Sequence, residues 1–157
     1  ELLEHLGYGP RETFPKLAYA DVMHRYHVED VSRIEEARML EDDGRVAFLE
    51  YFPESTSPFW NMKRDESGRA CKIDVIIDGM ETIGSAERAT DPEIMRKRFY
   101  TISDGQYAKK LFDLFGQDRV ERELNDFLAL TFFPRFGAGI GMTRLIASME
   151  KHRATAA

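Results

Sequence analysis

The chain of 157 residues contains a single cysteine, Cys71, and no apolar run of membrane-spanning length. One cysteine cannot form an internal disulfide, so the fold must be held by packing rather than by cross-links. The sequence also carries no charged-then-apolar secretion leader. We therefore expect a cytoplasmic protein that does not bind a membrane.

Basic charge is in short supply as well. Lysine and arginine number 22 against 28 aspartates and glutamates, which gives a net charge of −6. Proteins that bind nucleic acid over a large surface usually carry a basic excess. Any contact with RNA would then use a local patch, or a segment outside this chain.

Two common nucleotide loops and the common nucleophile sets are missing. There is no Gly-Lys-Ser/Thr of a Walker loop, and the sixth place of a dinucleotide G-x-G-x-x-G is Met142. No Ser/His/Asp or Cys/His set is recognisable either. The residues therefore give no indication of a protein nucleophile.

The most informative feature present is Gly137-x-Gly139-x-Gly141-x-x-Arg144. Glycines at every second position leave one face of an extended strand without side chains, so a flat ligand can lie on the backbone. The helical spacing that follows places Arg144 near the start of a helix. A guanidinium donates hydrogen bonds to phosphate and stacks on planar rings, so the segment suits a nucleotide.

This segment resembles motif 3 of the class II aminoacyl-tRNA synthetases. The resemblance implies that Arg144 binds ATP, with Gly137, Gly139 and Gly141 as the floor of the site. The aspartate, asparagine and lysine subgroup usually has glutamate before this arginine, where this chain has Thr143. Asparagine synthetases of the same fold tend to carry a small hydroxyl residue there, which favours them within the family.

A second cluster, Glu81, Ser85, Glu87 and Arg88, lies on one predicted strand. Glu81 and Ser85 can supply oxygen ligands for Mg²⁺, and Arg88 can bind a carboxylate or amide bidentately. In a regular strand the first three share one face and Arg88 points away, unless a bulge at Gly84 turns the strand.

The family resemblance implies specific roles for this second cluster. Glu81 would hold Mg²⁺ with help from Ser85, Arg88 would recognise the side chain of the substrate, and Glu87 would contact its amino group. For the nearby aspartates, we expect Asp78 to form a turn and Asp74 to face solvent, because Asp74 lies off the apolar face of its strand. His24 and His27 are expected to form a surface pair rather than a metal site.

The pattern of elements predicts an α+β fold, an antiparallel sheet flanked by helices, as in the class II synthetases. Helices are predicted over 1–6, 18–26, 31–42, 91–99, 104–115, 118–130 and 141–152, and strands over 45–52, 59–63, 70–77, 80–88 and the glycine segment. No strand with the Arg-x-Glu of motif 2 is predicted upstream of residue 60. Residues 1–157 are thus expected to be the C-terminal part of one catalytic domain, without motifs 1 and 2.

The resemblance implies an ATP-dependent ligase that activates aspartate or asparagine as an acyl-adenylate, with ATP and Mg²⁺ as cofactors. An aspartyl- or asparaginyl-tRNA synthetase would pass the acyl group to tRNA. An asparagine synthetase would let ammonia attack the activated side chain of aspartate. The remaining alternative is a non-catalytic paralogue or fragment, and the family also implies a homodimer formed through a segment absent from this chain.

Overall fold

The computed structural model describes residues 1–156, with the side chains of residues 1–153. These residues form two compact units. Unit 1 comprises residues 1–52, 72–85 and 138–157, and unit 2 comprises residues 53–71 and 86–137. Residue 157 lies outside the described part.

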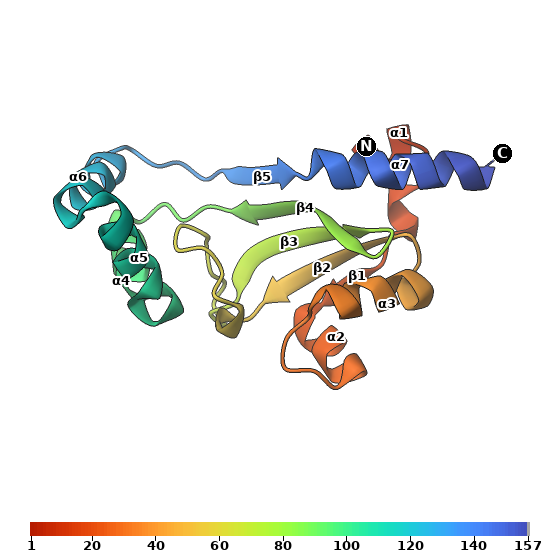
Figure 1. Ribbon diagram of the computed structural model, residues 1–157, viewed down its shortest axis with the longest axis horizontal. Helices are drawn as coiled ribbons and strands as arrows, with labels where there is room; N and C mark the ends of the chain where they lie inside the picture. The colour runs from red at the N-terminus through yellow and green to blue at the C-terminus, as the bar shows by residue number, and fades with distance from the viewer. Residues whose placement is uncertain (157) are drawn as a thin grey trace. The chain divides into compact units, whose positions relative to one another are not determined.

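A five-stranded sheet runs in the order β1-β2-β3-β4-β5 (Figure 1). Its strands are β1 (Lys16–Ala18), β2 (Val46–Phe52), β3 (Ala70–Ile77), β4 (Met80–Glu87) and β5 (Phe136–Ile140). Strand β1 was not predicted, and it pairs with β2 in parallel, with Leu17 opposite Leu49. The expectation of a wholly antiparallel sheet is therefore wrong at this edge, whereas the α+β class and the other four strands are confirmed.

Helices in unit 1 follow their local sequence signals. They are α1 (Leu2–His5), α2 (Tyr19–Tyr26), α3 (Arg33–Asp43) and α7 (Met142–Ala156). Helix α3 begins with a capping box, in which the Ser32 hydroxyl accepts the Ile34 amide and the Glu35 carboxylate accepts the Ser32 amide. The core of this unit contains Val46, Val75, Ile77 and Leu145, contributed by β2, β3 and α7.

The turn between β3 and β4 anchors the helices of unit 1. Asp78 and Gly79 both have positive φ, as a two-residue hairpin turn requires, so the turn predicted at Asp78 is confirmed. Asp78 is also buried and forms an ion pair with Arg45 at 2.8 Å. It accepts a hydrogen bond from Ser148 of α7 as well. Burial opposes ionisation of Asp78, but the hydrogen bonds from Arg45 and Ser148 outweigh it and lower the pKa of the carboxyl.

Unit 2 is built on three helices that lie together (Figure 1). They are α4 (Pro92–Thr101), α5 (Gln106–Phe115) and α6 (Gln117–Leu128). Short 3₁₀ turns lie at Glu54–Thr56 and Ile102–Gly105 in this unit, and another lies at Arg11–Thr13 in unit 1. Asp91 caps α4 by accepting the amides of Glu93 and Ile94. The predicted strand over 59–63 is wrong: only isolated bridges form, Met62 with Arg88 and Arg64 with Ala70. Trp60 instead packs into the helical core of the unit, edge-on to Phe99 and Phe127.

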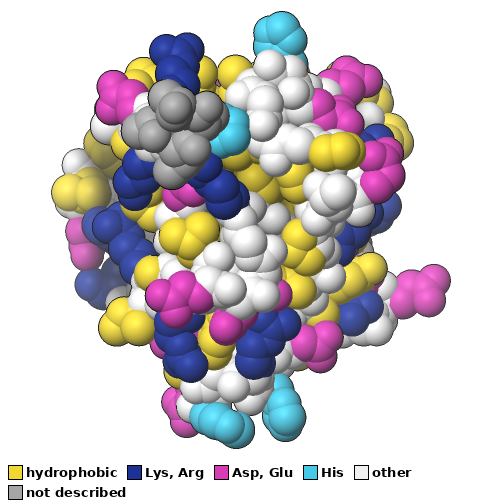
Figure 2. Space-filling view, turned by 90° about the vertical axis from the view of Figure 1, so that its right-hand side faces the viewer, with side chains coloured by type: hydrophobic (Ala, Val, Ile, Leu, Met, Phe, Trp, Pro, Cys, Tyr) yellow, Lys and Arg dark blue, Asp and Glu magenta, His cyan; other side chains and the backbone are white. Residues whose placement is uncertain are grey.

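Within the described residues no helix is long and apolar enough to span a bilayer. On the face that Figure 2 presents, basic and acidic side chains are interspersed rather than gathered by sign. His24 and His27 are both exposed, with ring centroids 6.3 Å apart, which confirms the predicted surface pair.

Candidate functional site

In unit 1 the strand β5 leads into α7 through Gly141, whose backbone groups hydrogen-bond to both a strand and the helix. The Gly141 amide donates to the Thr82 carbonyl of β4 at 2.8 Å, and the Gly141 carbonyl accepts the Leu145 amide at 2.9 Å. A Cβ added at Gly139 would meet nothing within 4 Å, so the backbone there is open to a ligand. The strand-then-helix geometry predicted for this segment is confirmed.

Arg144 lies on the first turn of α7, half-buried, and points to β4. Its guanidinium donates a hydrogen bond to the carbonyl of Glu81. One contact to a carbonyl leaves other N–H donors of the fork for a ligand. Thr143, the neighbour that differs from the usual family residue, is exposed. The structure thus brings Arg144 to Glu81, two residues that were predicted to act in one site.

The carboxylates of Glu81 and Asp74 approach the same point, above Gly84. A Cβ added at Gly84 would lie 3.0 Å from Glu81 Oε1 and 3.3 Å from Asp74 Oδ1. Residues 81 and 84 would face opposite ways in a regular strand, so β4 departs from strict alternation between them. The irregularity considered at Gly84 is therefore present.

Asp74 is 4% exposed, so the expectation that it faces solvent is wrong. Lys72 forms an ion pair with its Oδ2 at 2.5 Å, while Oδ1 is buried without a hydrogen-bond partner among the described residues. Burial raises the pKa of Asp74 to about 6, although Lys72 acts in the opposite direction. A buried carboxylate with an unpaired oxygen is costly unless a ligand or cation satisfies it.

Glu36 of α3 also reaches this place. Its Oε2 accepts the backbone amide of Glu81 at 2.8 Å, which holds β4 next to the helix. Burial raises the pKa of Glu36, and the charge of Glu81 acts in the same direction. Among the described residues, no group of three or more histidine, cysteine or acidic side chains has metal-ligand geometry. Asp74 and Glu81 are thus a pair of carboxylates rather than a complete metal cage.

Ser85 does not share this side of the strand with Glu81. Its hydroxyl donates to the Ile73 carbonyl at 3.1 Å, and its side chain lines a separate hollow with Ile73 and Val75. The expectation that Glu81 and Ser85 lie on one face is wrong, because the irregularity between residues 81 and 84 turns the strand. The Ser85 hydroxyl is also already engaged in the hydrogen bond to the Ile73 carbonyl.

In unit 2, Arg88 lies directly on the backbone of Gly137. A Cβ added at Gly137 would be 2.6 Å from Arg88 Nη2, so any larger residue would displace the guanidinium. The side chain also donates to Asn61 Oδ1 at 3.4 Å, and it has no carboxylate partner among the described residues. Glycine at 137 therefore makes room for an arginine rather than for a ligand directly.

Glu87, next to Arg88, is neutralised within unit 2. Its Oε1 forms an ion pair with Lys63 at 2.7 Å. Lys63 is half exposed, so this pair contributes little to stability. A contact between Glu87 and a substrate amino group would have to compete with Lys63, a residue that the sequence analysis did not select.

Two of the polar residues around Glu81 were missed from the sequence, Asp74 as a site residue and Glu36 altogether. The available signal for Asp74 was its position in a hairpin with Glu81, because a two-residue turn at 78–79 brings both strands side by side. Glu36 had no local signal, since it reaches the strand from a helix 45 residues away. The tripeptide Arg33-Ile34-Glu35 has the letters Arg-x-Glu but lies on α3, where Glu35 serves the capping box.

Comparisons with known proteins agree with this geometry. The family described as tRNA synthetases class II (D, K and N) matches residues 4–154. An asparaginyl-tRNA synthetase from Pyrococcus horikoshii, complexed with asparaginyl-adenylate, is similar over 88% of this chain with a TM-score of 0.66 and 23% identity. Asparaginyl-tRNA synthetase from Entamoeba histolytica, also with asparaginyl-adenylate, has a TM-score of 0.67 over 94% of this chain with 17% identity.

The aspartyl-tRNA synthetase from Entamoeba histolytica is similar over 87% of this chain, with a TM-score of 0.63 and 19% identity. This chain spans 28% of that protein, 32% of the Pyrococcus enzyme and 35% of the Entamoeba asparaginyl enzyme. No curated protein sequence matches the chain. The chain thus has the fold of about a third of these synthetases.

Proposed function

The chain belongs to the class II tRNA synthetases of the D, K and N group, and we propose that it supplies the ATP and amino-acid sites of a ligase that activates aspartate or asparagine. In that reaction a carboxylate oxygen of the amino acid attacks the α-phosphorus of ATP. The bond to pyrophosphate breaks, and an acyl-adenylate forms. The observation that carries the proposal is the open backbone at Gly139 of β5, followed on the first turn of α7 by Arg144 beside Glu81.

Gly139, Gly141 and Arg144 are the proposed ATP-binding residues. Gly139 leaves the backbone uncovered, and Arg144 keeps N–H donors free for a phosphate or a face free for a base. Gly137 belongs to the same motif but acts by admitting the guanidinium of Arg88. These residues bind and orient the nucleotide, which is the main contribution available to a site without a nucleophile.

Glu81 and Asp74 are the proposed ligands for Mg²⁺. The fit rests on the buried, unpartnered Oδ1 of Asp74 and on its approach, with Glu81 Oε1, to one point above Gly84. Mg²⁺ is usually held by one or two carboxylates together with substrate phosphates, so a pair suffices. When bound, the ion would neutralise phosphate charge as pyrophosphate leaves. Ser85, predicted as a second ligand, is a weaker candidate because its hydroxyl already donates to Ile73.

Arg88 is the proposed residue for the side chain of the substrate. It lacks a carboxylate partner among the described residues, and Asn61 and Gly137 fix its position. A planar fork can bind a carboxylate or an amide oxygen, so Arg88 by itself accepts both aspartate and asparagine. Glu87 remains the proposed contact for the amino group, in competition with Lys63.

A tRNA-independent asparagine synthetase is the second candidate, favoured by one observation. Thr143 is exposed beside Arg144 in place of the glutamate usual among the tRNA enzymes. In that case the side-chain carboxylate of aspartate would be activated, and ammonia would displace AMP. A longer protein that contains this chain would add motifs 1 and 2, a homodimer contact and, for the tRNA enzyme, an RNA-binding region, all in the cytoplasm.

The ATP site is tested by Arg144→Ala in the 157-residue chain. Loss of a charge-assisted contact to phosphate should weaken ATP binding by about tenfold or more. Isothermal titration calorimetry would measure the affinity, and circular dichroism would check the fold. Thr143→Ala is the matched control on the same helix turn and should retain affinity. ATP affinity unchanged in Arg144→Ala would remove the arginine from the site.

The reaction is tested in a longer protein that contains this chain, by ATP–pyrophosphate exchange. Exchange that depends on aspartate or asparagine is the expected result. Formation of free asparagine from aspartate and ammonia, without tRNA, would identify the second candidate. Bound ATP without exchange for any amino acid would contradict both and identify a non-catalytic member of the family.

A further inference from the structure

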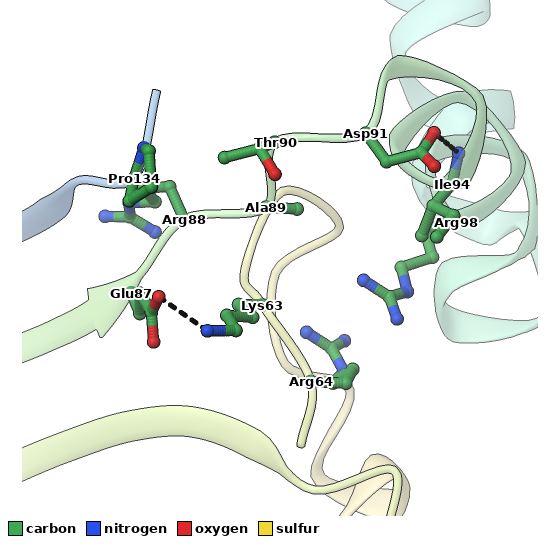
Figure 3. Close-up of a pocket in the computed structure, with 10 residues that line it drawn as sticks. All are labelled: Lys63, Arg64, Glu87, Arg88, Ala89, Thr90, Asp91, Ile94, Arg98 and Pro134. Carbon is green, nitrogen blue, oxygen red and sulfur yellow. Dashed lines mark hydrogen bonds and ion pairs between the residues drawn. The ribbon is translucent and has the colours of Figure 1, made fainter. Parts of the chain in front are cut away.

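Unit 2 contains a basic hollow of about 200 Å³, which shares Glu87 and Arg88 with the proposed amino-acid site but also includes Thr90 and Arg98, to which no role has been given. Figure 3 shows its lining, in which Thr90 and Asp91 lie on one side and Lys63, Arg64 and Arg98 on the others. Four of the lining residues are basic, Lys63, Arg64, Arg88 and Arg98, against two acidic ones, Glu87 and Asp91. In a chain with a net charge of −6, such a local excess points to an anionic ligand.

Most of these charges already have partners. Lys63 pairs with Glu87 at 2.7 Å, and Arg64 pairs with Glu54 at 2.6 Å. Asp91 is hydrogen-bonded to the first amides of α4 and so serves that helix. Arg88 lies against Gly137, and Figure 3 shows its guanidinium on the far side from Arg98.

Arg98, like Arg88, differs from these ion-paired cations. Its Nη1 donates to the Met62 carbonyl at 3.2 Å, but the same oxygen also accepts from Arg64 at 2.9 Å. No carboxylate forms an ion pair with Arg98 among the described residues. Burial and the adjacent charge of Arg64 lower the pKa of Arg98, a sign of two cations held close together. An anion in the hollow would relieve that repulsion.

We propose that this hollow binds a phosphate group, with the guanidinium of Arg98 and the hydroxyl of Thr90 as donors. Thr90 is exposed in the lining and makes no side-chain hydrogen bond to any described residue. Figure 3 shows Thr90 and the guanidinium of Arg98 on different sides of the hollow, while the ammonium of Lys63 is turned toward Glu87. Tetrahedral phosphate oxygens can accept from several directions at once, whereas a planar carboxylate has only two oxygens.

The test titrates the 157-residue chain with inorganic phosphate at low ionic strength, where surface charges are least screened. Amide shifts by NMR should move at Ala89, Thr90 and Asp91, and the fitted affinity should fall about tenfold or more in Arg98→Met. Lys97→Met is the matched control, because Lys97 is an exposed cation on the same helix. It should change the affinity less than about twofold, as a rim charge does.

Thr90→Val is the second variant, and it should weaken phosphate binding about fivefold without changing charge. If Arg98→Met does not fold, the phosphate affinity of Thr90→Val tests the proposal instead. Pyrophosphate and a short oligouridylate identify the source of the phosphate group. Pyrophosphate that binds more strongly than inorganic phosphate would support the site and indicate a free phosphate ligand. Oligouridylate that binds more strongly would support the site and indicate a polynucleotide. Absence of shifts at Ala89–Asp91 in the folded wild type would overturn the proposal, as would equal losses in Arg98→Met and Lys97→Met. Arg98 and Thr90 belong to neither the proposed ATP site nor the proposed amino-acid site, so phosphate binding measured with these variants can fail or succeed separately from ATP–pyrophosphate exchange.

Discussion

At the scale of single residues, the burial of Asp74 lowers the stability of the fold at neutral pH but suits the proposed binding of a cation. Its carboxyl has an ordinary pKa of 3.8, raised to about 6 by burial in the fold. Between these values the folded chain holds a proton that the unfolded chain has lost, so folding stability from this group is fully present below about pH 4 and is lost as the pH rises through 6. At neutral pH the ionised carboxylate is therefore destabilising, which suits a residue kept to bind a cation.

Asp74→Asn should consequently stabilise the protein at pH 7.5 by about 1–3 kcal/mol and have little effect near pH 4. The same variant should remove the proposed contribution of Mg²⁺ to ATP affinity. Urea unfolding at both pH values and calorimetry with and without Mg²⁺ measure the two effects. Asp113→Asn, the same charge change at a largely exposed ion pair with Lys109, is the control and should stay within about 0.5 kcal/mol. An effect of Asp74→Asn that does not depend on pH would contradict the assignment.

Residue types at the site were easier to predict than their surroundings. The glycines and Arg144 were recognised because their spacing depends on a single strand and a single helix turn. Asp74 was misplaced because alternation with Ile73 and Val75 shows only which side of the strand it lies on, not what covers that side. The face of the strand on which Ser85 lies was not predicted, because an irregularity of β4 changes the alternation of side chains after Glu81. The neighbouring residues in the sequence do not reveal such an irregularity.

At the scale of elements, the contact of α3 with the β3–β4 turn fixes the part of unit 1 that carries Glu36 and Glu81. Gly79 has φ +76°, and a Cβ added there would lie 2.9 Å from Ala37 Cα. That atom belongs to the helix backbone, so the contact cannot be relieved by a change of rotamer. Helix and hairpin must therefore separate if position 79 carries a side chain.

Gly79→Ala should destabilise unit 1 by about 2–4 kcal/mol, the sum of left-handed backbone strain and overpacking. Gly68→Ala is the control: Gly68 also has positive φ, +78°, but a Cβ there meets nothing within 4 Å. It should cost about 1 kcal/mol. Denaturant unfolding of both variants measures the difference. Equal losses of unfolding free energy in Gly79→Ala and Gly68→Ala would show that α3 does not contact the β3–β4 turn closely in solution.

The bounds of β3 and α6 were predicted within two residues, whereas α7, predicted over 141–152, continues to Ala156. Two short pieces were not predicted correctly. Strand β1 has three residues, too few for a periodic signal, and it exists because β2, some thirty residues later, pairs with it in parallel. Residues 59–63 have strand-like aromatics, but Trp60 is buried among α4 and α6, so tertiary packing overrides the local preference.

At the scale of the whole molecule, the two units have separate apolar cores. The core of unit 1 includes Leu3, Val75 and Leu145, and that of unit 2 includes Trp60, Met95 and Leu124. Trp60 is the single tryptophan of the chain. Its fluorescence therefore reports on unit 2, whereas far-ultraviolet circular dichroism reports on the helices and strands of both.

Gly79→Ala, which perturbs unit 1, should move the unfolding midpoint seen by circular dichroism more than the midpoint seen by tryptophan fluorescence. The reason is that Gly79 contacts α3 within unit 1, whereas Trp60 lies in the core of unit 2, and stability need not be uniform across a structure. Val120→Ala, in the core of unit 2, should do the reverse and shift fluorescence at least as much. Coincident midpoints in the wild type that shift equally in both variants would show that the two cores unfold as a single cooperative structure.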